Sequence, residues 1–364
     1  MLAIAINHLS YLMRDLGMEG RGIPTLTVLG YSSAAELFFL LSGYMVGLVY
    51  VGRADASRRL ISRAATIYLV NLATFLTVLA LALSEPPALS SVTFIGHSLE
   101  DPARGIVDFA LFRQHPILLD VLFYYVVLMI AAVPVVALLK RFPAAAMACS
   151  VALYLAVQFD PQLNIPVKSA TGSNVWSFNP FAWQLLFFGG ILAGRHRLYD
   201  RFAALVAKPM VLGALCLLFL LAFLLKLAEL GDIIVIPLEW IDKTGVAPLR
   251  LVHALLVLGL LTAVAGFVQR VLPRNPLVAM VARVGRNTLQ CFAASVVATY
   301  ALAALWLRFA PTYLGYLACA AVMLVLVCLT ALLREGWRGR FRRQATAASD
   351  TVMSPSTSLA SRRT

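Results

Sequence analysis

Charged residues are scarce in this chain: they make up 13% of its 364 residues, whereas hydrophobic residues make up 61%. Soluble domains carry roughly 25% charged residues. With a mean hydropathy of +0.86, the chain has more apolar surface than a water-soluble globule of this size can bury. The composition therefore excludes a soluble enzyme and a disordered chain, and it predicts a polytopic membrane protein.

Cysteine is also sparse, and the sequence has no CxxC pair and no histidine at metal-ligand spacing from a cysteine. These absences exclude a disulfide scaffold and give no sign of a metal site. All five cysteines lie inside apolar runs, where buried structural thiols are the simplest interpretation: Cys149, Cys216, Cys291, Cys319 and Cys328. No cleavable signal peptide is visible.

A membrane-spanning helix needs about 20 consecutive apolar residues. Ten segments qualify or come close: 1–13, 31–51, 60–83, 117–139, 143–159, 181–194, 209–227, 249–269, 285–307 and 312–333. The first is too short to cross a bilayer, and we therefore expect the true start of the protein to lie upstream of Met1. The pattern predicts an all-α bundle of about ten transmembrane spans.

Basic residues alternate between the connecting segments and so predict orientation. The connections after the even-numbered spans, together with the tail, carry 21 of the 30 Lys and Arg residues. Cytoplasmic loops are enriched in Lys and Arg, so both termini are predicted to be cytoplasmic. This also explains the net charge of +13 without a nucleic-acid partner.

We expect one transmembrane domain over residues 1–334 and a tail over 335–364. The tail is basic and then rich in Ser, Thr and Ala, a composition typical of disorder. Three long connections, 84–116, 160–180 and 228–248, lie on the predicted outer side. Long connections inside a compact protein are usually functional.

A set of polar side chains within the spans falls in the predicted outer third of the membrane, and no comparable set lies at the midplane. Ionisable groups inside spans are costly and are functional candidates by default. The set is His8, Glu36, Asp120, Gln184, Arg250 and His253, with Asn179 and Trp183 next to it. Their convergence on one side predicts a polar site at the outer end of the bundle.

Most members of this set also have a structural interpretation. An intramembrane His or Gln can tie two helices by a hydrogen bond, which applies to His8, Gln184 and His253. Arg250 can extend to the interface, and Asp120 can cap its helix. Glu36 is harder to explain, because its neighbours in AAELFFLLSGY are mostly apolar.

Small and aromatic residues have structural interpretations too. Gly43 and Gly47, like Gly190 and Gly194, form GxxxG pairs that let two helix backbones approach closely. Four tryptophans fall near the outer face, where they form an aromatic belt or stack on sugar rings: Trp176, Trp183, Trp240 and Trp306.

Five stretches resemble the OpgC family in the same order and spacing. They are YSSAAELFFLLSGYMVGLVY, RQHPILLDVLFYYVVLM, NPFAWQLLFFGGILAG, APLRLVHALL and VGRNTLQCF. Members of that family are inner-membrane succinyltransferases with ten spans, which act on osmoregulated periplasmic glucans and are related to the wider membrane O-acyltransferases. The resemblance implies transfer of an acyl group, succinyl among the candidates, from cytoplasmic acyl-CoA to a glycan hydroxyl, without a permanently bound cofactor.

The chain departs from the family pattern at two places. The family's first span has a basic residue upstream of the histidine that matches His8, and the corresponding position falls before Met1. The block before Glu36 usually reads Ser-Asp-Ala-Ala-Glu, and here Ser33 replaces the acidic residue.

Acyl transfer to a hydroxyl needs a base and donors for the oxyanion. His8 is the expected base, with Glu36 or Asp120 orienting its imidazole as a carboxylate does in a Ser-His-Asp triad. The sequence leaves the choice of carboxylate open. No GxSxG motif is present, which favours direct transfer over an acyl-enzyme.

Substrate contacts are expected from the other members of the set. Gln184 or Asn179 would donate to the oxyanion, and Arg250 would bind the carboxylate of a succinyl group. Trp183 and His253 complete the predicted substrate site. An inner arginine cluster is explained by topology alone, or it binds lipid headgroups or the phosphates of coenzyme A: Arg53, Arg58, Arg59, Arg283 and Arg286.

A secondary transporter for a small carboxylate or sugar is the alternative function. Transporters place polar residues and helix breaks near the midplane, at matched positions in two halves. Here the polar set lies at one face, which favours the enzyme over the transporter.

Overall fold

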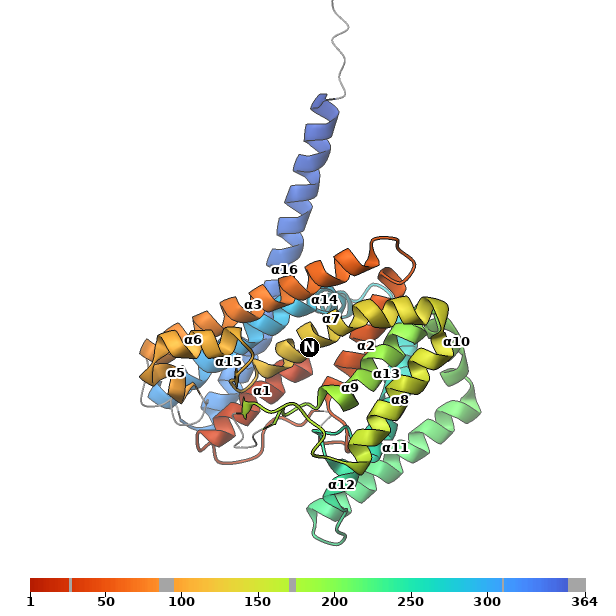
Figure 1. Ribbon diagram of the computed structural model, residues 1–364. Coiled ribbons are helices and arrows are strands. Elements are labelled where there is room, and N and C mark those ends of the chain that lie inside the picture. The colour runs from red at the N-terminus through yellow and green to blue at the C-terminus, as the bar shows by residue number, and fades with distance from the viewer. Residues whose placement is uncertain (26–27, 85–94, 170–174, 310, 353–364) are drawn as a thin grey trace, which may run out of the picture.

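The structure, a computed structural model, describes residues 1–25, 28–84, 95–169, 175–309 and 311–352. Within these ranges, each of the ten predicted spans coincides with a helix. The helices are α1 (Leu2–Asp15), α2 (Ala34–Val49), α3 (Ala56–Ser84), α7 (Asp120–Arg141), α8 (Pro143–Phe159), α9 (Pro180–Arg195), α11 (Pro209–Leu230), α13 (Pro248–Val271), α15 (Thr288–Phe309) and α16 (Tyr313–Val352). The all-helical membrane bundle is confirmed (Figure 1).

Six of these helices are long and apolar enough to cross a membrane: α3, α7, α11, α13, α15 and α16. The other four are shorter, with 14 residues in α1, 16 in α2, 17 in α8 and 16 in α9. A helix of 16 residues spans about 24 Å, which is less than the ~30 Å hydrocarbon core. The number of true spans thus stays a prediction.

Short elements occupy the connections. They are α5 (Gly96–Glu100), α6 (Pro102–Ala110), α10 (Tyr199–Val206), α12 (Leu238–Ile241), α14 (Pro276–Arg286), β1 (Gln114–His115) and β2 (Lys168–Ser169). The two strands pair in parallel, with Gln114 opposite Lys168. The two strands join two of the long connections predicted on the outer side, so backbone hydrogen bonds hold these connections to each other.

Helix α2 packs directly on α9 through the two predicted GxxxG pairs. A Cβ added to Gly43 would overlap the carbonyl oxygen of Phe187, and one on Gly190 would overlap the carbonyl oxygen of Leu40. Gly47 and Gly194 are equally tight against the opposite backbone. Close contact of the two backbones is therefore possible only because these four positions lack side chains.

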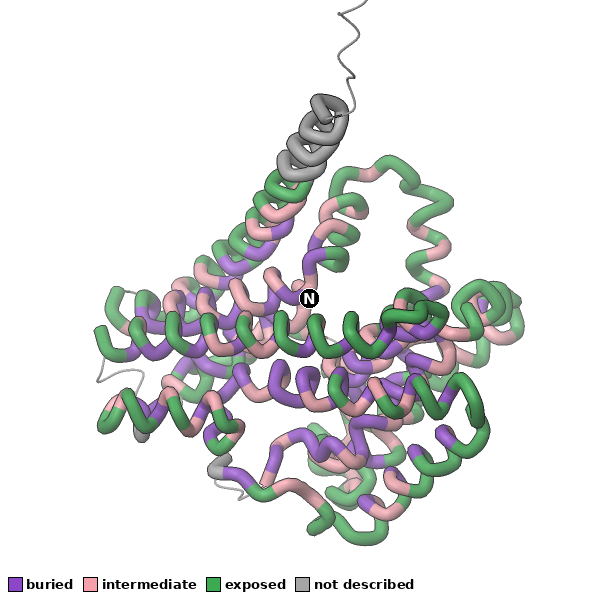
Figure 2. The backbone as a smooth tube through the Cα atoms, turned by 45° about the horizontal axis from the view of Figure 1, so that its top comes forward, coloured by how far each residue is buried: buried purple, intermediate pink, exposed green. Residues whose placement is uncertain are grey.

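The buried core lies between the packed helices, whereas their outward sides are exposed (Figure 2). Exposed faces rich in Leu and Val suit lipid contact, and α11 is the extreme case, because none of its described residues is buried. Helix α16 projects from the bundle at its C-terminal end (Figure 1). It continues to Val352, so the first part of the tail expected to be disordered is helical, and residues 353–364 lie outside the described residues.

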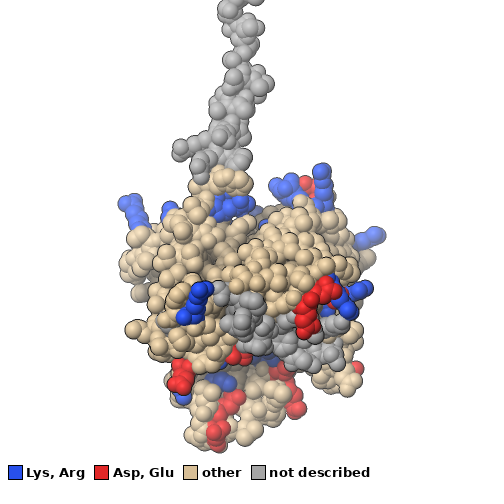
Figure 3. Space-filling view, turned by 90° about the vertical axis from the view of Figure 1, so that its left-hand side faces the viewer, with Lys and Arg blue, Asp and Glu red and all other residues tan. Residues whose placement is uncertain are grey.

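Charge is unevenly distributed along the bundle. In the face shown in Figure 3, Lys and Arg side chains gather toward the end from which α16 projects, and most Asp and Glu lie lower on the molecule. This matches the segregation of basic residues that predicts a cytoplasmic end.

A substitution at Gly190 tests the contact between α2 and α9. We expect Gly190→Ala to destabilise the protein by about 1–3 kcal/mol or more, because the added methyl group meets backbone that cannot move independently. Gly189→Ala is the matched control, since no described atom lies within 4 Å of its Cβ position. Thermal unfolding in detergent measures both, and equal stability of the two variants would contradict the close contact.

Thiol labelling tests the orientation. In a cysteine-free background, Ala54→Cys lies exposed between α2 and α3, and Gln162→Cys lies exposed after α8. We expect a membrane-impermeant reagent to label position 162 in intact spheroplasts and position 54 only after lysis. The reverse pattern would overturn the predicted orientation.

Candidate functional site

A cavity of about 950 Å³ opens among α1, the start of α2, the start of α7 and the segments around β1 and α12. His8 and Asn7 line it from α1, and Asp120 lines it from α7. His115 and Lys243 contribute from two connections predicted on the outer side. Of the residues predicted for the polar site, His8 and Asp120 line this cavity.

His8 is half-buried in the wall of this cavity. Its ring packs edge-on against Phe292, with 5.7 Å between centroids. Its Nδ1 is buried and has no hydrogen-bond partner among the described residues. A buried histidine that ties two helices would be hydrogen-bonded, so this geometry favours a chemical role over the helix-tying alternative.

Asp120 is the first residue of α7 and is half-buried in the same cavity. One carboxylate oxygen accepts a hydrogen bond from the backbone N–H of Val121 at 2.9 Å. The positive end of the helix dipole favours negative charge at this position. The carboxylate thus has a stabilising contact at the helix end and also borders the cavity.

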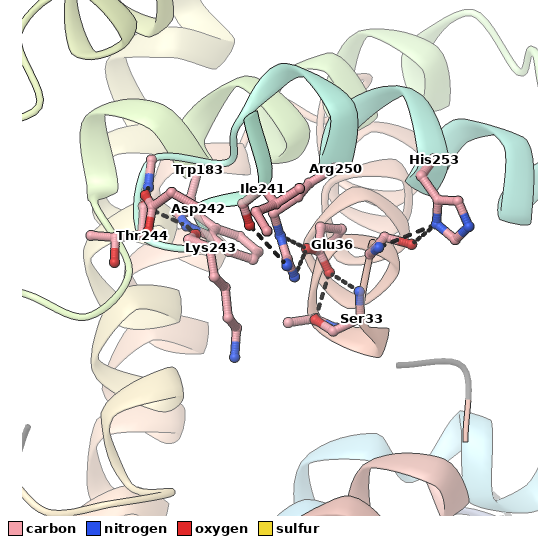
Figure 4. Close-up of polar contacts among 12 residues, drawn as sticks. Ser33, Glu36, Trp183, Ile241, Asp242, Lys243, Thr244, Arg250 and His253 are labelled. Atoms are coloured by element: carbon pink, nitrogen blue, oxygen red, sulfur yellow. Dashed lines mark hydrogen bonds and ion pairs between the residues drawn. The ribbon is translucent and has the colours of Figure 1, made fainter. Parts of the chain in front are cut away.

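Glu36 lies in the first turn of α2 and is fully buried. Its Oε2 accepts hydrogen bonds from the backbone N–H of Ser33 at 2.8 Å and from the Ser33 hydroxyl at 2.6 Å. Its Oε1 accepts from Arg250 Nε at 2.9 Å and from Nη2 at 2.6 Å (Figure 4). Ser33 therefore caps α2 and anchors Glu36.

Neither Glu36 nor Arg250 is among the residues that line the cavity. Glu36 therefore binds Arg250 and does not orient His8 in this structure, which favours Asp120 as the carboxylate that works with His8. Arg250, expected to bind the substrate carboxylate, is instead neutralised by Glu36. A buried ion pair of this kind ties α2 to α13.

Residues 242–247 form a loop between α12 and α13 that carries Lys243, and several side chains hold the backbone of this region. Trp183 Nε1 donates to the carbonyl oxygens of Lys243 at 3.2 Å and Thr244 at 3.0 Å. Arg250 Nη1 donates to the carbonyl oxygen of Ile241 at 3.4 Å (Figure 4). Trp183 thus positions this loop and does not itself line the cavity.

The side chain of Lys243 extends away from the Glu36–Arg250 pair (Figure 4) and lines the cavity. Its Nζ lies 4.6 Å from the ring centroid of Phe178. Separation from bulk water lowers the pKa of Lys243, and the negative charges of Glu36 and Asp120 act in the opposite direction. The sequence analysis did not select Lys243, because a lysine in a polar connection carries no special signal.

Asn179, Gln184 and His253 also lie outside the cavity lining. Asn179 caps α9 by accepting from Phe181 N–H at 3.0 Å. Gln184 bridges α9 to Ser150 of α8, accepting from its hydroxyl at 2.6 Å and donating to its carbonyl oxygen at 2.8 Å. These contacts match the structural interpretation of buried amides in a membrane bundle.

His253 contacts the segment that precedes α2. Its Nδ1 lies 2.7 Å from the Ser32 hydroxyl, and its ring occupies the space that a side chain at position 30 would need, so Gly30 has to be glycine. Its Nε2 is buried without a partner among the described residues. His253 thus holds the segment that precedes α2 in place.

The inner arginines separate into two groups. Arg58 lines a second cavity of about 390 Å³ together with Arg59 and Arg63, and Arg53 lies exposed in the turn before α3. Arg283 and Arg286 lie in α14, where both pair with Glu335, at 3.2 and 2.8 Å. Arg58 and the two arginines of α14 therefore have different partners.

His115 is a further cavity residue that the sequence analysis missed. It is buried in β1 and packs on Phe123 and Trp176, with centroid distances of 5.1 and 4.9 Å. Burial lowers the pKa of His115 to about 4, so it is neutral at physiological pH. The predicted site was drawn from polar residues inside spans, and His115 was missed because it lies in a connection.

Among the described residues, no three His, Cys, Asp or Glu side chains gather as metal ligands.

The fold and the cavity define a helical membrane protein with a histidine, a carboxylate and a lysine on the mostly apolar wall of one cavity. The chain belongs to the OpgC protein family, whose model matches residues 1–339. The family indicates an acyltransferase of the glucan succinyltransferase kind. Comparison with curated proteins and with solved structures finds no significant match.

Stability measurements separate the roles of the two carboxylates. Glu36→Gln leaves the Arg250 guanidinium buried without its counter-charge, a change that costs about 3–5 kcal/mol in buried pairs. Asp120 borders an open cavity, so Asp120→Asn should leave the free energy of unfolding nearly unchanged. Thermal unfolding of the two variants in the same detergent compares them, and a stable Glu36→Gln variant would contradict the structural role of the pair.

Proposed function

We propose that the protein transfers an acyl group from acyl-CoA to a hydroxyl of a periplasmic glucan or related glycan, within the 950 Å³ cavity. The observation that carries the proposal is that His8 and Asp120 share this cavity in a chain of the OpgC family. The family supplies the reaction class, and the cavity supplies a base with a carboxylate on its wall.

His8 would act as the general base. It takes the proton of the sugar hydroxyl while the hydroxyl oxygen attacks the thioester carbonyl carbon. Asp120 stabilises the imidazolium that forms, as a carboxylate does in a Ser-His-Asp triad. The tetrahedral intermediate then collapses, the carbon–sulfur bond breaks, and the thiolate of coenzyme A receives the proton from His8.

The two substrates would approach from opposite ends of the bundle. The acceptor reaches the cavity past the connections around β1 and α12, which are predicted to face the periplasm. The coenzyme A head stays at the basic end, where Arg58 lines the second cavity, and its pantetheine arm passes between helices toward His8. This arrangement requires the inner membrane, because acyl-CoA is cytoplasmic.

The charged side chains that line the cavity favour binding of an anionic substrate. Arg14, Arg21 and Lys243 line it together with the carboxylate of Asp120, so cationic side chains outnumber anionic ones. A succinyl donor adds a carboxylate that suits this excess of positive charge. Succinyl transfer to a glucan is therefore the specific form of the proposal.

Removal of the base tests the proposal. General base catalysis contributes typically 10²–10⁴-fold, and we expect His8→Ala to lose activity by such a factor in a purified assay with succinyl-CoA and a glucan acceptor. His196→Ala is the matched control, because His196 is exposed at the end of α9. Activity of His8→Ala within tenfold of wild type would exclude His8 as the base.

The double variant of His8 and Asp120 adds a second criterion. When two residues act as one unit, changing both lowers the activity about as much as the more damaging single change does. We therefore expect His8→Ala combined with Asp120→Asn to be no slower than His8→Ala alone. Multiplicative losses would show that the two residues act independently.

A further inference from the structure

Lys243 differs from Arg250 and Lys226, the cations of the neighbouring helices α13 and α11, in its ion pairing. Arg250 is neutralised by Glu36 at 2.6 Å, and Lys226 of α11 pairs with Glu229 at 3.0 Å. Lys243 has no carboxylate within 4.0 Å in the described part of the chain, although Glu36 and Asp120 are close enough for their charges to act on it. It is thus a cation without a direct counter-ion.

The position of Lys243 is fixed by its surroundings. Trp183 holds its carbonyl oxygen, and the ring of Phe178 lies under its ammonium group. The loop is also held by Tyr154, whose hydroxyl donates to the Val246 carbonyl oxygen at 3.0 Å. These contacts hold the backbone of Lys243 and place its ammonium group at Phe178, which reduces the conformational entropy lost when an anion binds.

Lys243 also lies where the chemistry is proposed. Its side chain is accessible within the cavity that His8 and Asp120 line, and its charge acts on both of these residues. In the described part of the chain no carboxylate contacts its ammonium group, so a ligand in the cavity can supply the direct counter-ion.

We propose that Lys243 binds the free carboxylate of the acyl group and so selects a dicarboxylic acyl donor. The inference rests on the proposed acyl transfer at this cavity. In a succinyl group, two methylene groups separate the thioester carbonyl from the carboxylate, so an ammonium group near His8 is suitably placed to bind it. Arg250, the residue expected to do this, is already paired.

A competing role for Lys243 is stabilisation of the oxyanion that forms during transfer. That role would apply to every donor, because each thioester passes through the same tetrahedral intermediate. Carboxylate binding applies only to donors that carry a carboxylate. Comparison of two donors on one variant therefore separates the two roles.

The test uses the full-length protein in lipid nanodiscs with succinyl-CoA and butyryl-CoA as donors and one glucan acceptor. Butyryl-CoA has the same chain length with a methyl group in place of the carboxylate. We expect Lys243→Met to lower the ratio of kcat/KM for succinyl-CoA over butyryl-CoA on the order of 10- to 100-fold, as expected for loss of a hydrogen bond to a charged group. Lys243→Arg should retain most of the wild-type ratio.

The ratio is independent of the fraction of folded protein, because both donors are measured on one preparation. Lys226→Met is the matched control, since it removes a lysine that is already paired with Glu229, and it should keep the wild-type ratio. Equal losses for both donors in Lys243→Met would overturn the selection role and leave the proposed function intact. Absence of transfer by the wild-type protein with every donor would overturn the proposed function and this inference with it.

Discussion

A buried carboxylate and a buried guanidinium meet where α2 and α13 begin, and the geometry of the cavity depends on this contact. Glu36 accepts from Arg250 with one oxygen and from Ser33 with the other, so a single side chain caps α2 and fixes it to α13. Arg250 in turn donates to the Ile241 carbonyl oxygen at the end of α12, directly before the loop that carries Lys243. Inside a membrane bundle, polar groups must find partners within the protein, and this requirement sets the relative position of the three segments.

Close helix packing and the polar site depend on each other. The four glycines of α2 and α9 bring these backbones together, which sets Trp183 of α9 beside the Lys243 loop. The side chains that we assign to chemistry, His8 and Asp120, come from different helices, α1 and α7. The rigid contacts thus lie around the cavity, and the less constrained polar groups lie on its wall, as expected for a site that has to hold a substrate.

Sequence patterns predicted the helices and part of the site. Long apolar runs located ten helices, because helix length and hydropathy are local properties. Glycine spacing predicted two surfaces suited to close packing, and only the fold shows that they pack on each other. His8 and Asp120 were predicted because polar residues in apolar runs are conspicuous. The pairing of Glu36 with Arg250 joins residues 214 positions apart, which no local pattern encodes. Lys243 and His115 lie in connections where such residues are ordinary, so only the fold brings them to the cavity.

The activity proposed for this cavity is transfer of an acyl group from coenzyme A to a glycan. To test it, the purified protein in nanodiscs is incubated with a periplasmic glucan and with succinyl-CoA that carries ¹³C in the succinyl group. The glucan is then analysed by mass spectrometry. We predict a glucan that gains labelled succinyl groups as ester, with free coenzyme A released in equal amount. An unlabelled glucan with the donor intact, from protein that is folded and monodisperse, would contradict the account.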